Sequence, residues 1–358
     1  MTGSATAFDF RDAIRTVVDG NELSLDQATA AMDAIMSGEV PGSQIAALVT
    51  ALRMRGETVA EIAGFATAMR AHSRKVEIDA ENRPLLDTCG TGGDHSNSFN
   101  ISTTATFAIA ATGVRIAKHG NRAASSICGS ADLLEGLGVQ VELTSDEVVS
   151  CIEDVGVGFM YAPAFHPAMR FVGPTRREIG IRTVFNVLGP LTNPAGAGHQ
   201  LIGVGHPEIA PKLAEVLAML GSARTVLVHS EDGLDEIGIA GGTSITEWDR
   251  KRGDVLSYAI APQDFGMDPG KPHDLLGGDV DTNVSITRAI LEGEKGPRRN
   301  VTLLNAGAGI YAAEAAGSID EGIAMAAEAI DSGRALAKLD ALVTRTRQLV
   351  AERGEVPA

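Results

Sequence analysis

Two glycine-rich stretches of the chain contain residue types that bind anions. Residues 90–94 (GTGGD) hold three glycines within four positions, which lets backbone amide groups approach a phosphate closely. Residues 118–126 (KHGNRAASS) follow about one strand and one helix later and add Lys118 and Arg122, which can neutralise phosphate charge. Two such loops predict a ligand with two phosphate-bearing ends, such as a sugar that carries a phosphate and a pyrophosphate.

A predicted helix start lies between these loops. Residues 100–103 (NIST) offer side chains that can cap a helix and free backbone amides that attract an oxyanion. The Walker A pattern requires Gly-Lys-Ser/Thr at the end of its loop, and no such run follows Gly90. The Rossmann pattern requires its third glycine where the helix opens, whereas residues 94–100 intervene here. Neither common nucleotide motif therefore fits.

The adjacent carboxylates Asp235 and Glu236 are a candidate metal site. They lie in residues 233–237 (GLDEI), after a predicted strand at 225–229. A departing pyrophosphate needs a divalent cation, because backbone amides offset its charge only in part. Mg²⁺ takes oxygen ligands, usually a few from the protein and the rest from phosphate and water. Charged pairs on loops are most often solvated, so this pair alone does not identify a metal site.

The composition is that of a globular enzyme with two domains. A chain of 358 residues is too long for one typical core, and its 44% hydrophobic and 21% charged residues are ordinary values. The net charge of −16 argues against nucleic acid as a general partner, because the field repels polyanions. A small phosphorylated substrate can still bind through local amides, cations and a metal.

The cysteines and the N-terminus indicate a cytoplasmic protein. Cys89, Cys128 and Cys151 form no CxxC pair, so we expect neither a disulfide framework nor a zinc site, but a reducing compartment. Residues 1–12 lack the basic start and apolar core of a signal peptide. No apolar run reaches the length that spans a membrane, so no membrane partner is expected.

The positions of these motifs follow from a change of pattern near residue 84. In residues 8–72 apolar side chains recur at helical spacing, and capping boxes at 24–27 (SLDQ) and 58–61 (TVAE) predict helix starts. From residue 84 onward, strands and helices alternate, which predicts a mostly parallel sheet with covering helices. Broad apolar faces on the N-terminal helices indicate that part of this surface meets a second subunit.

The α/β region is expected to contain strands that end near the motifs. One strand should lead into Gly90, and the others are expected at 114–117, 139–143, 157–161, 201–204, 225–229 and 301–304. Five prolines interrupt the alternation in residues 162–196. The pattern predicts one long amphipathic helix over residues 319–352.

The motifs GTGGD, NIST, KHGNRAASS and GSADLLEGLG (129–138), in this order and spacing, resemble those of the anthranilate phosphoribosyltransferases of tryptophan biosynthesis. The resemblance extends to residues 176–194, 233–237 and 291–311, so it covers nearly the whole chain. It implies a small all-helical N-terminal domain and a larger α/β domain with a central, mostly parallel sheet. The helical domain is expected at 1–76, completed by about 163–190, and the α/β domain at 77–162 and 191–358, with the active site in the cleft between them.

The resemblance also implies an activity and its site. The family joins anthranilate to phosphoribosyl pyrophosphate, generally as a homodimer through the helical domain. The matching ligands of Mg²⁺, expected as two ions, are Ser102, Asp235 and Glu236. The matching anthranilate contacts are Gly90, Asn121 and Arg176, whose fork suits a carboxylate. The matching phosphoribosyl pyrophosphate contacts are Gly90, Gly93, Asp94, Ser98, Asn100, Ile101, Ser102, Thr103, Lys118, His119, Gly120, Asn121, Arg122, Ala123, Ala124, Ser125, Ser126 and Ser130.

Two details of the implied site stay open. His119 and His166 are expected to line the acceptor tunnel, although a lone histidine is more often structural. No catalytic acid or base is assigned, because an aromatic amine is already neutral at pH 7. The sequence departs from the family at Ala124 and Cys128, where Val and Ser are commoner, and in residues 238–242 (GIAGG), which carry few side chains.

Two other functions are alternatives to this one. A pyrimidine nucleoside phosphorylase shares the fold, but its lysine after the first loop and its His-Thr-Gly-Gly-Thr second loop are absent here. A non-catalytic relative that binds nucleic acid would need a basic stripe, whereas this chain is acidic and keeps Asp235 and Glu236.

Overall fold

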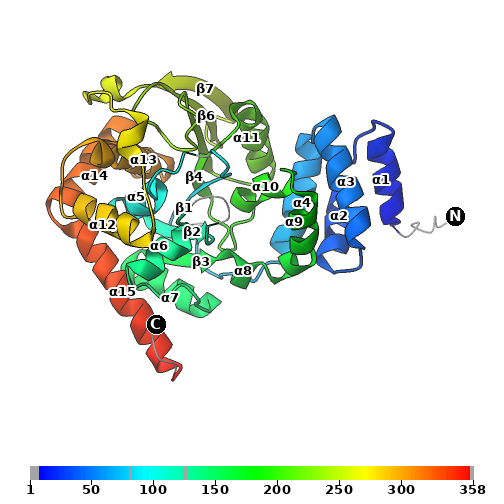
Figure 1. The fold of residues 1–358 in the computed structure, drawn as a ribbon, viewed down its shortest axis with the longest axis horizontal. Coiled ribbons are helices and arrows are strands. Elements are labelled where there is room, and N and C mark those ends of the chain that lie inside the picture. The colour runs from blue at the N-terminus through cyan, green and yellow to red at the C-terminus, as the bar shows by residue number, and fades with distance from the viewer. Residues whose placement is uncertain (1–7, 81, 95, 124–126, 355–358) are drawn as a thin grey trace.

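The computed structural model describes residues 8–80, 82–94, 96–123 and 127–354. A helical part at one end lies beside a larger α/β part (Figure 1), as predicted. The predicted capping boxes at Ser24 and Thr58 are present. Gly38 and Gly56 follow the ends of the second and third helices and adopt φ of 78° and 89°. The N-terminal helices are α1 (Phe10–Val18), α2 (Leu25–Met36), α3 (Gly42–Arg55) and α4 (Val59–Ala71).

A seven-stranded sheet forms the centre of the α/β part, in the order β3-β2-β1-β4-β5-β6-β7. The first five strands run parallel and the last two antiparallel, which confirms a mostly parallel sheet. From β1 the chain moves to one side for β2 and later to the other side for β4, so the order reverses between β1 and β4. The strands are β1 (Leu85–Gly90), β2 (Arg115–Gly120), β3 (Val157–Tyr161), β4 (His199–Gly203), β5 (Arg224–Ser230), β6 (Thr243–Asp249) and β7 (Asp254–Ile260).

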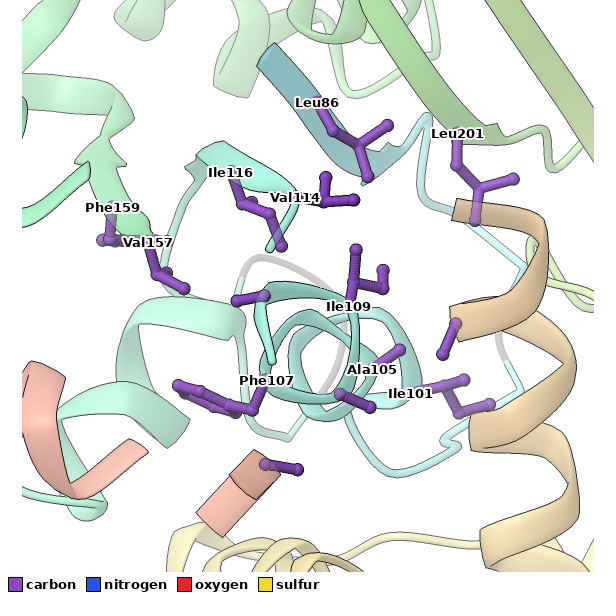
Figure 2. Close-up of a cluster of buried hydrophobic side chains, with 14 of the residues drawn as sticks. Leu86, Ile101, Ala105, Phe107, Ile109, Val114, Ile116, Val157, Phe159 and Leu201 are labelled. Atoms are coloured by element: carbon purple, nitrogen blue, oxygen red, sulfur yellow. The ribbon is translucent and has the colours of Figure 1, made fainter. Parts of the chain in front are cut away.

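Helix α5 (Ile101–Ala110) lies at the centre of the larger core. Figure 2 shows Ile109 on the side of α5 that faces Leu86 and Ile116 of the strands. Burial of each such side chain contributes about 1.5–3 kcal/mol, so the helix start at residue 101 is held firmly under the sheet. The other helices of this part are α6 (Ser130–Gly136), α7 (Ser145–Val155), α11 (Ala210–Met219), α12 (Val280–Leu291), α13 (Pro297–Ala312), α14 (Ile319–Asp331) and α15 (Arg334–Glu352), with 3₁₀ turns at Pro207–Ile209, Pro262–Phe265 and Pro272–Leu275.

The proline-rich segment after β3 returns to the N-terminal helices. It forms α8 (Ala162–Phe165), a 3₁₀ turn (Pro167–Phe171), α9 (Gly173–Ile179), α10 (Phe185–Leu188) and a second 3₁₀ turn (Gly189–Leu191). All of these except α10 have a proline in the first turn, where its missing N–H costs no hydrogen bond. Val172, Phe185 and Leu188 belong to the same buried cluster as the apolar faces of α2 and α4.

Two of the predicted strands are wrong. Residues 139–143 belong to no strand; they are extended and lie against α15, where the Gln140 amide donates to Thr346 Oγ1 at 3.1 Å. Residues 301–304 lie in α13, which is buried on nearly all sides. A helix buried all round has no polar face, so its continuous apolar run resembles that of a buried strand.

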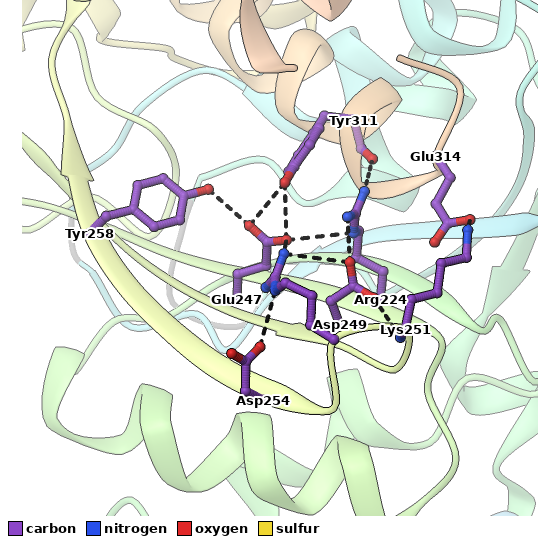
Figure 3. A network of polar contacts seen from close by, with 9 residues as sticks. Arg224, Glu247, Asp249, Lys251, Asp254, Tyr258, Tyr311 and Glu314 are labelled. Atoms are coloured by element: carbon purple, nitrogen blue, oxygen red, sulfur yellow. Dashed lines mark hydrogen bonds and ion pairs between the residues drawn. The ribbon is translucent and has the colours of Figure 1, made fainter. Parts of the chain in front are cut away.

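Strands β6 and β7 were not predicted because acidic residues interrupt their apolar pattern. Glu247 is buried in β6, where both Tyr258 and Tyr311 donate hydroxyl hydrogen bonds to its carboxylate at 3.0 Å (Figure 3). Arg224 and Arg252 pair with Glu247 and with Asp249. The network offsets the desolvation cost of two buried acids, so a strand can contain them.

The C-terminal region forms two helices rather than the predicted single one over 319–352. The chain breaks at Gly333, which adopts a φ of 76° between α14 and α15. Such a conformation stops a helix, although the amphipathic pattern continues on both sides. Among the described residues, none of these helices combines the length and the apolar character needed to cross a membrane.

Candidate active site

The candidate site lies at the carboxyl edge of the sheet, where β1, β2 and β4 end in Gly90, Gly120 and Gly203. Ligands of parallel sheets bind at this edge, next to the point where strand order reverses. The glycines allow a close approach of the loop after β5. A Cβ at Gly203 would lie 1.6 Å from the Asp235 carbonyl oxygen, and one at Gly90 would lie 2.6 Å from Asp235 Oδ2.

The first glycine-rich loop is fixed by contacts to neighbouring strand ends. The Thr91 amide donates to the Gly203 carbonyl at 2.8 Å, and Thr91 Oγ1 accepts from the Gly205 amide at 3.0 Å. Gly92 and Gly93 adopt φ of 66° and 81°, a region that favours glycine. The Gly92 amide donates to Asp235 Oδ2 at 2.9 Å. The loop is therefore directly attached to one of the predicted metal ligands.

The NIST residues stand at the start of α5, but Asn100 does not cap the helix with its side chain. Instead, Asn100 Nδ2 donates to the Cys128 carbonyl at 3.0 Å, which connects this helix start to the end of the second loop. The Ser102 amide donates to Glu236 Oε1 at 3.2 Å, so a carboxylate occupies the positive end of the helix. Ile101 and Thr103 have buried side chains, so a ligand can reach them only through the backbone. Ser98 pairs with Leu276 in an isolated bridge.

The second loop leaves β2 and leads into α6. Asp132 Oδ2 accepts from the amides of Ala123 and Gly129, each at 2.9 Å, and so holds both ends of this loop. Ser130 Oγ donates to the Asn121 carbonyl at 3.2 Å. The predicted contacts Ala124, Ser125 and Ser126 lie outside the described residues.

The two cations of residues 118–126 have different surroundings, because Lys118 lies within β2 and not in the loop that follows it. Lys118 is buried, and its ammonium donates to the Thr88 carbonyl. Burial lowers the pKa of Lys118, while the neighbouring Asp87 acts in the opposite direction. Arg122 extends over the surface, where it pairs with Glu135 and with Asp132 at 3.4 Å. In this arrangement Arg122 is directed toward α6.

Asp235 and Glu236 form an acidic centre suited to a metal. Burial raises the pKa of Asp235 well above its usual value, and the nearby carboxylates of Asp94 and Glu236 add to this effect. Burial also raises the pKa of Glu236 to about 7, although Lys118 and Ser102 favour its charged form. Partly buried acids that repel one another would be relieved by a cation with a preference for oxygen ligands. The residues therefore fit Mg²⁺.

The protein supplies only part of such a coordination shell. Within the ranges that the structure describes, no group of three or more His, Cys, Asp or Glu side chains is arranged to hold a metal ion. The Ser102 hydroxyl, which lies beside Glu236, could supply a further oxygen ligand. The remaining ligands of Mg²⁺ would then come from phosphate and water, its usual partners in phosphate chemistry.

A cavity of about 760 Å³ lies between these strand ends and the helical part. It is lined by Gly90 and Asn121 from the sheet and by Arg176 from α9, the three residues predicted to contact the acceptor. The guanidinium of Arg176 lies 5.8 Å from the ring centre of Phe185, and its partial burial lowers its pKa. Arg177 also lines this cavity. A partly buried guanidinium in a cavity that also has apolar walls suits a small aromatic carboxylate.

His119 and His166 face one another at the inner end of this cavity. Their ring centres are 5.0 Å apart, and both line its wall. Burial lowers the pKa of His119 to about 3 and that of His166 to about 4, so both rings are neutral at pH 7. Within the described part of the chain, neither buried Nε2 atom has a hydrogen-bond partner. Each of these nitrogens is therefore an unpaired polar atom close to the wall of the cavity.

Comparisons with known proteins agree with this arrangement. Residues 82–336 match the model of the "Glycosyl transferase family, a/b domain", and residues 11–73 match the "Glycosyl transferase family, helical bundle domain". Over 335 residues, the chain is 52% identical to the anthranilate phosphoribosyltransferase of Roseiflexus castenholzii, which covers 93% of this chain and 97% of that protein. The chain belongs to the anthranilate phosphoribosyltransferase family.

Solved structures of this family have the same fold. The anthranilate phosphoribosyltransferase of Thermus thermophilus superposes with a TM-score of 0.88 at 45% identity, over 94% of this chain and 99% of that chain. The Saccharomyces cerevisiae enzyme, solved in complex with phosphoribosyl pyrophosphate and Mg, gives a TM-score of 0.86 at 29% identity, over 96% of this chain and 99% of that chain. Family membership makes the chain a phosphoribosyltransferase of tryptophan biosynthesis.

Several residues that support the site were not predicted. Asp87 is buried in β1, where it accepts hydrogen bonds from Asn193 Nδ2 at 2.8 Å and from the His119 amide at 3.2 Å. Asn283 contacts Asn100, and Arg182 contacts the first glycine-rich loop. These contacts join residues that are far apart in the sequence, and no local pattern could have identified Asp87 or Asn283 as partners in them.

Proposed function

We propose that the cleft transfers the 5-phosphoribosyl group of phosphoribosyl pyrophosphate to the amine of anthranilate. The products are N-(5-phosphoribosyl)anthranilate and pyrophosphate. One observation supports this most strongly: the first residues of both glycine-rich motifs and the proposed acceptor arginine Arg176 line one cavity. A phosphorylated donor and an aromatic acceptor would then lie side by side, which would lower the entropic cost of their reaction.

The donor would be held mainly by backbone amides. The proposed contacts are the amides of the 90–94 loop, the start of α5 and the described part of the second loop, as the family resemblance implies. Amides at a helix start and in a glycine-rich loop favour phosphate oxygens. Lys118 would add a positive charge beneath the loops, where its ammonium already lies near the carboxylates of Asp87 and Glu236.

Ser102, Asp235 and Glu236 would hold Mg²⁺, which we propose binds as two ions. When bound, the metal would stabilise the negative charge of the departing pyrophosphate. The chain's part is to hold the carboxylates in place: the Gly92 amide donates to Asp235, and the Ser102 amide donates to Glu236. Both ligands are thus aligned by the same loops that would hold the donor.

The acceptor would bind with its carboxylate toward Arg176 and its amine toward the sheet. Displacement of pyrophosphate would proceed with inversion at the anomeric carbon, through a transition state that resembles an oxocarbenium ion. The amine of anthranilate is neutral at pH 7, so no general base is required. The neutral rings of His119 and His166 would line the acceptor's path without competing for its carboxylate as cations would.

We further propose a cytoplasmic homodimer with the domain division given above. The dimer would form through the helical part, where Val18, Leu25 and Met54 are exposed apolar side chains of α1, α2 and α3. Exposed apolar side chains on neighbouring helices suit a contact with a second subunit. The three free cysteines suit a reducing compartment.

The activity can be tested with the purified full chain. Anthranilate is fluorescent, so mixing it with phosphoribosyl pyrophosphate, Mg²⁺ and the protein should cause a loss of its fluorescence. Omitting either the donor or the metal should abolish the decay. A stable signal with all components present would refute the proposed function.

A further inference from the structure

Arg182 joins the acceptor side of the cleft to the first glycine-rich loop. It lies between α9, which carries Arg176, and α10. Its Nη2 atom donates to the Gly92 carbonyl at 3.0 Å and to the Thr91 carbonyl at 3.4 Å. A Cβ at Gly93 would lie 1.6 Å from Nη1, so the guanidinium lies directly against the loop backbone. Among the described residues, no carboxylate pairs with Arg182, and its hydrogen bonds go to these two carbonyls.

These contacts determine the direction of two successive peptide groups. The Thr91–Gly92 peptide group is held at both ends: its carbonyl accepts from Arg182 and its N–H donates to Asp235 at 2.9 Å. The carbonyl of the next peptide group, Gly92–Gly93, also accepts from Arg182. Because both peptide groups are trans, their N–H groups point away from the guanidinium, toward the side of Asp235.

The second of these N–H groups is free to bind a ligand. In the part of the chain that the structure describes, the Gly93 amide has no protein acceptor. Gly92 and Gly93 adopt φ of 66° and 81°, and successive N–H groups on one side of such a turn form an anion-binding concavity. The carboxylates proposed to bind Mg²⁺ lie on that same side, which is where the phosphates of the donor would lie.

We infer that Arg182 is a positioning residue for the phosphoribosyl donor. It holds the 91–93 backbone so that the Gly93 amide can donate to a phosphate oxygen, and it does not contact the donor itself. The inference rests on the proposed function and extends it. Because Arg182 follows α9 in the chain, it also makes the shape of the donor loop depend on the placement of the segment that carries the acceptor arginine.

The test compares Arg182→Ala and Arg182→Lys with Arg53→Ala. Arg53 is exposed and lines the same small hollow as Arg182, so its removal is a matched loss of charge. Calorimetric titration with phosphoribosyl pyrophosphate and Mg²⁺ should give a donor Kd raised about tenfold in Arg182→Ala, the change expected if the Gly93 amide no longer donates its hydrogen bond to a charged phosphate oxygen. Arg182→Lys should have an intermediate effect, because lysine keeps the charge and can still donate but lacks the planar guanidinium that lies against the loop backbone. Arg53→Ala should bind the donor as wild type does.

Two further measurements separate positioning from general damage. The Michaelis constant for anthranilate should change less than about twofold in Arg182→Ala, and added methylguanidinium should restore donor affinity to this variant but not alter Arg53→Ala. Unchanged donor affinity in a folded Arg182→Ala protein, or equal weakening of both substrates without rescue, would overturn the inference. If Arg182→Ala does not fold, Arg182→Lys and Arg182→Gln decide by the same measurements. Wild-type protein that binds the donor but forms no product with anthranilate would refute the proposed function alone.

Discussion

The side-chain amide of Asn283 donates a hydrogen bond to Oδ1 of Asn100 at 3.0 Å. Asn283 lies on α12, and its own Oδ1 accepts from the Gly278 amide at 2.9 Å. Asn100 in turn donates to the Cys128 carbonyl at 3.0 Å. A single buried side chain of α12 therefore supports the start of α5 and, through it, the end of the second glycine-rich loop.

Replacing Asn283 by alanine should loosen the start of α5 and the end of the second glycine-rich loop. Asn100 and Gly278 would each lose a buried hydrogen-bond partner, so we expect the free energy of unfolding to fall by about 1–3 kcal/mol. Urea denaturation followed by circular dichroism would measure this change. Asn300→Ala is the matched control, since the Asn300 side chain is only partly buried on α13, and it should change stability by less than about 0.5 kcal/mol. Equal stability of the two variants would contradict this role of Asn283.

Removing the guanidinium of Arg176 should weaken the binding of anthranilate more than the binding of phosphoribosyl pyrophosphate. Arg176→Ala should raise the Michaelis constant for anthranilate by about tenfold or more, because a charge-assisted contact to the carboxylate is lost in a desolvated cavity. The constant for phosphoribosyl pyrophosphate should change far less. Steady-state fluorescence assays with each substrate varied would give both values. Arg177→Ala tests the neighbouring assignment: if it has the larger effect, Arg177 is the acceptor residue.

Neutralising Asp235 should change the requirement for metal. Asp235→Asn keeps an oxygen that can accept from the Gly92 amide but loses the negative charge, so the loop should persist while Mg²⁺ binds more weakly. We expect the Mg²⁺ concentration for half-maximal activity to rise by about tenfold or more. Asp281→Asn, an exposed position on α12, should leave this concentration unchanged. Complete removal of the metal with a chelator should stop the wild-type reaction.

The buried histidines should make the fold sensitive to acid. Burial lowers the pKa of His166 from 6.5 to about 4, so between these pH values the unfolded chain binds a proton that the folded chain does not. The free energy of unfolding should therefore decrease as the pH falls through this range, by up to about 1.4 kcal/mol per pH unit for this residue. His119, with its pKa lowered to about 3, acts in the same direction.

Replacing His166 by asparagine isolates its share of this effect. The slope of unfolding free energy against pH between about 6.5 and 4 should become shallower by about one proton, whatever the change in stability at pH 7. Urea titrations at several pH values would measure the slope. His206→Asn, at a side chain that is 54% exposed, should keep the wild-type slope. A slope that does not change in His166→Asn would contradict the prediction.

The sequence predicted those parts of the site that depend on short-range patterns. Residues 90–94 and 118–126 begin in the last residues of strands β1 and β2. Parallel strands bring their carboxyl ends to one edge, so the two motifs could be predicted to meet there. Capping boxes predicted helix starts at Ser24 and Thr58, because their hydrogen bonds lie within one turn. Family motifs placed Arg176 at the cavity that Gly90 also lines.

Contacts between segments that are distant in the chain could not be predicted from the sequence. Arg182 meets Gly92, Asn193 meets Asp87, and Asn283 meets Asn100, across 90, 106 and 183 residues of sequence. The apolar pattern gave wrong predictions where tertiary surroundings decide the structure. Residues 301–304 are mostly apolar because α13 is enclosed by other elements, and this run therefore resembles a strand. Glu247 can lie in β6 only because tyrosine and arginine side chains contact its carboxylate.

The N-terminal helices do not have a buried core of their own. The buried cluster beneath α2 and α4 also contains Val172 and Phe185 from the returning segment and Leu213 from α11. A fragment that ended after α4 would thus expose the apolar faces of α2 and α4 to water and would not fold independently. The helical part and the α/β part therefore fold together around the substrate cleft. A change that stabilises one side of the cleft should also stabilise the other side.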